Sequence, residues 1–90
     1  MKPQKLLELF EDLADRLEIR IVHGKGDFQG GPCLVNGENV IVVNKQKLIE
    51  QRLKILAEGF GNLDLSDVYI KPALRSYIDE ILHTLFSEKS

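Results

Sequence analysis

The N-terminal part of the chain carries the periodicity of an amphipathic helix. Its apolar side chains recur at helical spacing, at Leu6, Phe10, Leu13, Ala14 and Leu17. This spacing places them on one face of a helix, while the charged residues between them fall on the other. Pro3 is tolerated in a first helical turn because the N–H group that proline lacks would have no partner there. The pattern predicts a helix from about Pro3 to Leu17.

The periodicity then changes from helical spacing to alternation. Ile19 and Ile21 alternate with Glu18 and Arg20. A period of two is typical of a strand with one buried face. We therefore expect a strand over Ile19–Val22.

A β-hairpin is predicted further on, where two apolar segments flank Asn36-Gly37. Asn-Gly is the favoured pair for a type I′ turn, because both central residues of that turn need a positive φ. The first segment is Cys33–Val35, and the second, Val40–Val43, is apolar at four consecutive positions. A strand with one wet face would alternate, so we expect both faces of Val40–Val43 to be covered. We place it in the middle of a three-stranded sheet, between Cys33–Val35 and Ile19–Val22.

Two more helices are predicted in the C-terminal half. The second runs from about Lys47 to Phe60, with Asn44 as its candidate N-cap. The third opens at Pro72 and carries apolar residues such as Leu74 at helical spacing. The element order is α-β-β-β-α-α. It indicates a single α+β domain over residues 1–90, with a three-stranded, mainly antiparallel sheet packed against helices.

Composition narrows the classes of function. The chain has 90 residues, 43% of them hydrophobic, and a net charge of −2. This length gives room for one core, and the apolar content is too high for a disordered chain. The slight negative charge argues against a nucleic-acid partner, because such binding depends on clustered cations. A local basic stretch is interpreted as a solvated helix face; it comprises Lys45, Lys47, Arg52 and Lys54.

The distribution of apolar residues and the cysteine content indicate the cellular location of the protein. No apolar run reaches the roughly 18 residues that span a bilayer, and acidic residues interrupt the apolar positions that an N-terminal signal peptide would need. The lone cysteine, Cys33, cannot form a disulfide within the chain, which fits a reducing compartment. We expect a cytoplasmic protein without a membrane partner.

The segment Gly24–Cys33 is the first place to look for a site, because it holds four of the seven glycines and the only cysteine. One hypothesis makes Cys33 a nucleophile, with His23 or His83 as its base and Asp27 orienting the imidazole. The alternative is a structural thiol at the start of a strand. A second hypothesis is anion binding by the backbone N–H groups of the loop, with Lys25 adding positive charge. The alternative there is a plain connection between strands.

A metal site would draw on the same region, on Glu58 in the second predicted helix and on His83 in the third, although His83 is favoured near the end of a helix by the helix dipole alone. Structural zinc sites use paired short spacings such as Cys-x-x-Cys, and the chain has none. We therefore assign no catalytic residue, no metal and no cofactor. The candidate ligand-binding residues are His23, Lys25, Asp27, Cys33 and Glu58.

The second predicted helix contains Leu56-Ala57-Glu58-Gly59-Phe60-Gly61-Asn62 and follows a hairpin that ends at Val42-Val43-Asn44. This order resembles the core of the small zincin-type metallopeptidases related to phage anti-repressor proteases, in which the helix reads approximately Leu-Ala-His-Glu-Leu-Gly-His. The resemblance covers roughly residues 1–62 in element order. It places Glu58, Gly59 and Asn62 where the first His, the catalytic Glu and the second His would stand. It implies a degenerate zincin-like core without its metal ligands, and it brings no peptidase activity.

Two hypotheses about function follow, from different classes. The favoured one is a non-enzymatic binding or assembly module that forms a homodimer, because the predicted sheet and third helix carry more apolar surface than one small chain can cover. The alternative is a small-molecule or anion-binding protein, or a simple enzyme, that uses the Gly24–Cys33 loop together with Glu58 or Tyr69. A further possibility is regulation through a partner protein that binds the exposed side of the third helix. The Gly-Gly-x-Cys start of the hairpin is also similar to short uncharacterised bacterial proteins, which imply no activity.

Overall fold

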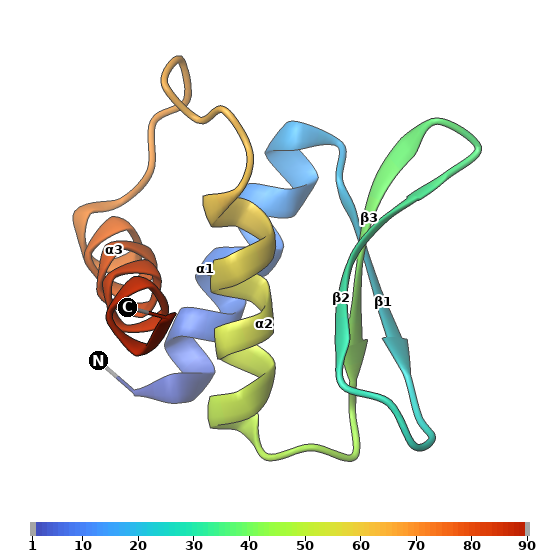
Figure 1. Cartoon of the computed structure of the whole chain (residues 1–90). Helices are drawn as coiled ribbons and strands as arrows, with labels where there is room; N and C mark the ends of the chain where they lie inside the picture. Colours follow the sequence, from blue (N-terminus) through green and yellow to red (C-terminus); the bar gives the residue numbers. More distant parts are fainter. Residues whose placement is uncertain (1, 90) are drawn as a thin grey trace.

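The computed structural model describes the backbone of residues 2–89 and the side chains of residues 2–84. The predicted order of elements is confirmed (Figure 1). The elements are α1 (Pro3–Leu17), β1 (Arg20–Gly24), β2 (Gly30–Val35), β3 (Glu38–Asn44), α2 (Ile49–Gly61) and α3 (Pro72–Lys89). The α+β class and the expected bounds of the first helix are confirmed with it.

The sheet has the order β1-β3-β2, so the apolar strand β3 occupies the expected central position. β3 pairs antiparallel with β2 and parallel with β1, which makes the sheet mixed and not mainly antiparallel. The reason lies in the connection between β1 and β2. These two strands lie on opposite sides of β3, so the intervening loop, Lys25–Gln29, crosses the end of β3 and the chain returns in the reverse direction along the far edge.

The predicted hairpin turn is confirmed in its backbone angles. Asn36 has a φ of 53° and Gly37 a φ of 80°, both in the region that a type I′ turn needs. Val35 and Glu38 form the pair that closes the turn. Asn and Gly tolerate these angles better than other residues, so the two residues at the tip fix the register of the whole hairpin.

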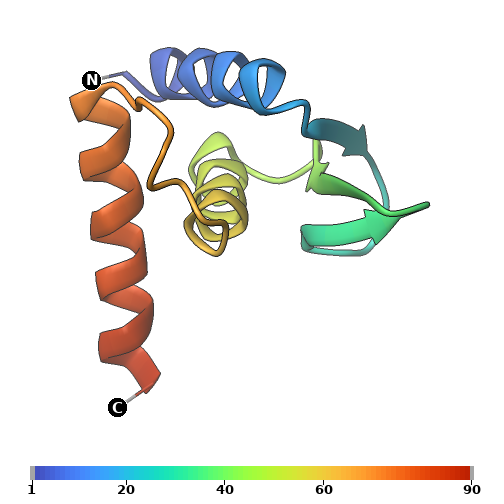
Figure 2. The same ribbon diagram turned by 90° about the horizontal axis from the view of Figure 1, so that it is seen from above.

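The helices lie on one side of the sheet. Figures 1 and 2 show α2 between the sheet and α3, with α1 beside α2. The centre of the core is formed by α1 and α2, where the Phe10 and Phe60 rings stack with centroids 5.7 Å apart. α2 approaches β3 closely at Gly59, where a Cβ atom would lie 2.9 Å from Ile41 Cδ1. This arrangement covers one face of the sheet and leaves the other without a helix.

Two local predictions are wrong at the end of β3 and the start of α2. Asn44 is the last residue of β3 and does not cap a helix. The helix starts at Ile49 and not at Lys47, and Leu48 precedes it as an N-cap without a side-chain hydrogen bond. The Asn44 side chain instead donates hydrogen bonds to the loop that crosses the end of β3.

Candidate functional site

The five candidate residues named from the sequence do not converge on one site. His23 is the penultimate residue of β1, Lys25 and Asp27 lie in the loop after the strand, and all three are exposed. Cys33 is exposed in β2, and only Glu58, half-buried on α2, lines a cleft. The five residues therefore do not share a common cleft.

The register of the sheet separates Cys33 from His23. Cys33 pairs with Val40 and His23 pairs with Val43. Paired residues share a face of the sheet, and residues three positions apart on one strand point to opposite faces. His23 and Cys33 thus lie on opposite faces as well as on opposite edge strands. This geometry does not support a thiol activated by that histidine. Within the described residues, no group of three or more His, Cys, Asp and Glu side chains could hold a metal ion.

The glycine-rich loop is tied to the end of β3 by Asn44. The Asn44 side chain is 1% exposed, and its Nδ2 donates to the carbonyl oxygens of Gly26, at 2.9 Å, and Phe28, at 2.6 Å. Its Oδ1 accepts a hydrogen bond from the Gln46 backbone N–H at 3.0 Å. The buried amide thus directs its N–H groups at the crossing loop and its oxygen at the turn after β3, so both ends have partners.

Structural contacts account for two of the four glycines in this segment, Gly26 and Gly30, without a ligand. The Gly26 N–H donates to Gln46 Oε1 at 3.2 Å, so it is not free to bind an anion. Gly30 has a φ of 101°, and a Cβ there would overlap the Val42 carbonyl oxygen. Glycine is needed at such a position because it alone avoids both the strain and the overlap. The loop thus fits the structural interpretation better than an anion site.

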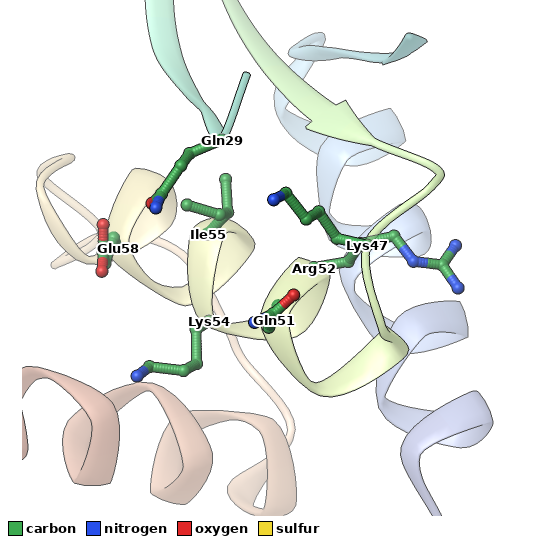
Figure 3. Close-up of a pocket in the computed structure, with 7 residues that line it drawn as sticks. All are labelled: Gln29, Lys47, Gln51, Arg52, Lys54, Ile55 and Glu58. Carbon is green, nitrogen blue, oxygen red and sulfur yellow. The ribbon is translucent and has the colours of Figure 1, made fainter. Parts of the chain in front are cut away.

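A cleft does form nearby, between the end of this loop and the outer face of α2 (Figure 3). Its volume is about 230 Å³. It is lined by Gln29, Lys47, Gln51, Arg52, Lys54, Ile55 and Glu58. Four of the five lining residues from α2 follow the three- and four-residue spacing of a single helix face: Gln51, Lys54, Ile55 and Glu58.

Sequence reasoning missed most of this cleft. The basic stretch was interpreted as a solvated helix face, yet Lys47, Arg52 and Lys54 all line the cleft. The helical spacing from Gln51 to Glu58 was a usable signal for one wall. The opposite wall, Gln29, could not be found because it is placed by the crossing of β3.

The uncovered face of the sheet is the second candidate surface. We call it the open face and define it by residues that the register places opposite Ile41 and α2: Val22, Cys33, Val35, Val40 and Val42. Val22 is 36% exposed and Val35 is 41% exposed, whereas Val40 is buried. The Phe28 ring, also 36% exposed, lies over Gly24 at one end of this face. The open face therefore carries valines on all three strands, and the register also places the exposed Arg20 and Glu38 on it.

The positions that carry the zincin resemblance have other roles on α2. Gly59 permits the close contact with Ile41, and Asn62 Nδ2 donates to the Glu58 carbonyl oxygen at 2.9 Å as the helix ends. Comparisons of the chain with protein-family models, curated proteins and solved structures find no match. The resemblance stays a prediction. In the part of the chain that the structure describes, no helix combines the length and apolar character needed to cross a membrane.

Proposed function

We propose that this protein is a small, non-enzymatic assembly module that forms a homodimer through its open face. The observation behind the proposal is that all three helices lie on one side of the sheet (Figure 2), and that the uncovered side carries valines on all three strands. A sheet face in contact with water normally presents polar side chains at alternate positions. Here each strand presents at least one valine on this face, as strands do where a sheet packs against another layer, and the charged side chains Arg20 and Glu38 share it.

A second copy is the occupant that this face fits best. Two apolar sheets pack face to face about 10 Å apart, and a symmetric pair needs only one self-complementary surface. The face is about three strands wide and six residues long, or roughly 14 Å by 20 Å. That is less than the ~800 Å² that each partner of a standard interface contributes. We therefore expect a dimer that dissociates in the micromolar range.

The test is native mass, measured by light scattering after size-exclusion chromatography over a concentration series. The wild-type chain is expected to approach twice the 10.2 kDa monomer mass as concentration rises. Val35→Lys places a charge on the open face at a position already 41% exposed, so it should leave the fold intact and abolish the dimer.

The next residue provides a matched control. Leu34 lies on the same strand but points to the other face, and it is 70% exposed. Leu34→Lys makes the same kind of change and should leave the dimer unaffected. A wild-type monomer at high micromolar concentration would contradict the proposal, and so would equal effects of the two substitutions.

A further inference from the structure

The cleft on α2 holds two half-buried side chains of opposite charge that do not pair with each other. Lys47 comes from the turn after β3, and Glu58 from the last part of α2. Among the residues that the structure describes, the single ion pair is Lys5–Glu8, on the surface of α1. In Figure 3 the Ile55 side chain lies between the Lys47 ammonium group and the Glu58 carboxylate. Partial burial weakens the hydration of both charges, so a group that bridges them would be stabilised from both sides.

The remaining lining adds hydrogen-bonding groups around this apolar floor. Gln29 extends toward Glu58 from the opposite wall, and Gln51 lies on the same face of α2 as Ile55 (Figure 3). The Arg52 guanidinium is turned away from Gln29 and Glu58. At about 230 Å³ the cleft is below the roughly 300–1,000 Å³ of pockets for drug-sized ligands. A small polar molecule matches this volume and this lining.

We propose that this cleft binds a free acidic amino acid. Lys47 supplies one positive charge for a carboxylate inside the cleft, and the exposed Lys54, whose ammonium group points away from Gln29 and Lys47 in Figure 3, can supply a second from the edge by a change of rotamer. Glu58 supplies one negative charge for the α-ammonium group. Gln29 and Gln51 each offer an amide that donates and accepts hydrogen bonds. Ile55 contacts the methylene groups. The proposal is independent of dimerisation, because the cleft lies on the helix side of the sheet and the open face lies on the other.

The first experiment is a titration of the ¹⁵N-labelled protein with L-glutamate at low salt, followed by amide chemical shifts. Saturable shifts are expected at Gln29, Gln51 and Ile55, with a millimolar or lower Kd, as suits a ligand of about ten non-hydrogen atoms. Lys47→Gln should weaken binding about five-fold, the effect of losing one partly exposed charge contact. Lys45→Gln removes the same charge outside the cleft and should change the Kd less than two-fold.

A matched ligand tests the role of Glu58. N-acetyl-L-glutamate keeps both carboxylates but replaces the ammonium group with a neutral amide, so it should bind the wild-type protein more weakly than L-glutamate. Glu58→Gln should weaken L-glutamate binding and strengthen N-acetyl-L-glutamate binding, because the repelling carboxylate is gone. The comparison of the two ligands on the wild-type protein needs no variant to fold. Absence of saturable shifts, equal effects of Lys45→Gln and Lys47→Gln, or equal affinity for the two ligands would each overturn the proposal.

Discussion

Asn44, at the end of the central strand, donates a hydrogen bond from its side-chain amide to the Phe28 carbonyl oxygen 2.6 Å away. The same amide group also bonds to the Gly26 carbonyl oxygen. One buried side chain thereby holds the chain where it crosses from β1 to β2. This crossing places β1 and β2 on either side of β3 and sets Gln29 at the wall of the cleft.

Removal of this side chain should destabilise the protein strongly. Asn44→Ala leaves two carbonyl oxygens and one N–H without their partner in a site that is 1% exposed. We expect a loss of about 2–3 kcal/mol in the free energy of unfolding, measured by urea denaturation. Gln46→Ala is the control, because it removes one exposed hydrogen bond and should cost less than about 1 kcal/mol. Equal losses for the two variants would contradict the role assigned to Asn44.

Because Gly59 contacts Ile41, the effect of Gly59→Ala on the free energy of unfolding should depend on the residue at position 41. Gly59→Ala gains about 1 kcal/mol of helix propensity, but its Cβ would lie 2.9 Å from Ile41 Cδ1. Overpacking of this kind costs about 1–3 kcal/mol, so the single variant should be less stable than wild type.

Ile41→Val removes Cδ1 and should reverse this effect. In that background Gly59→Ala is expected to raise the free energy of unfolding by up to about 1 kcal/mol. A double-mutant cycle by thermal or urea unfolding measures the coupling between the two sites. Additive effects would show that the close approach of α2 to β3 does not limit the residue at position 59.

We expect the folded protein to lose stability at alkaline pH because of the environment of Tyr77. Its ring lies edge-on to Phe10, with centroids 6.2 Å apart. Burial raises the pKa of Tyr77 above its usual value, and the Glu80 and Glu50 carboxylates add to this. The folded state therefore holds the phenol proton more tightly than the unfolded chain. Its contribution to stability is complete below the unfolded pKa, about 10, and is lost as pH rises from there through the folded pKa.

Tyr77→Phe should reduce this alkaline loss, as measured by unfolding curves between about pH 8 and pH 11. Tyr69→Phe provides the matched control, because Tyr69 is 68% exposed and should leave the pH dependence unchanged. If both variants keep the wild-type profile, another group causes the alkaline transition.

Cys33 offers an intrinsic reporter of the proposed dimer. Its thiol is exposed in the single chain and lies on the open face. If a second copy covers this face, alkylation by iodoacetamide should slow as protein concentration rises through the dimer Kd. Val35→Lys should keep the rate high at every concentration. A rate that does not vary in the wild-type protein would place any dimer contact elsewhere.

The sequence predicted the elements well because each depends on neighbours a few positions away. The helical spacing around Phe10 and the first-turn proline defined α1. The Asn36-Gly37 pair defined a type I′ hairpin, and the unbroken apolar run at Val40–Val43 indicated the central strand. The candidate site was predicted poorly, with Glu58 alone in the cleft. The glycine-rich segment before Cys33 suggested a site, but hydrogen bonding at Gly26 and close backbone approach at Gly30 explain two of its glycines.

Local order along the chain thus determined the helices, the hairpin and the position of β3, since periodicity and turn chemistry act over short separations. Only the tertiary structure decided which side chains meet. The face that a strand residue occupies depends on register with a partner distant in sequence, and this register separates His23 from Cys33. The path of the loop depends on hydrogen bonds from Asn44, 16 and 18 residues away. Neither relationship leaves a pattern in the local sequence, because each is decided by which distant backbone groups find partners when the chain folds.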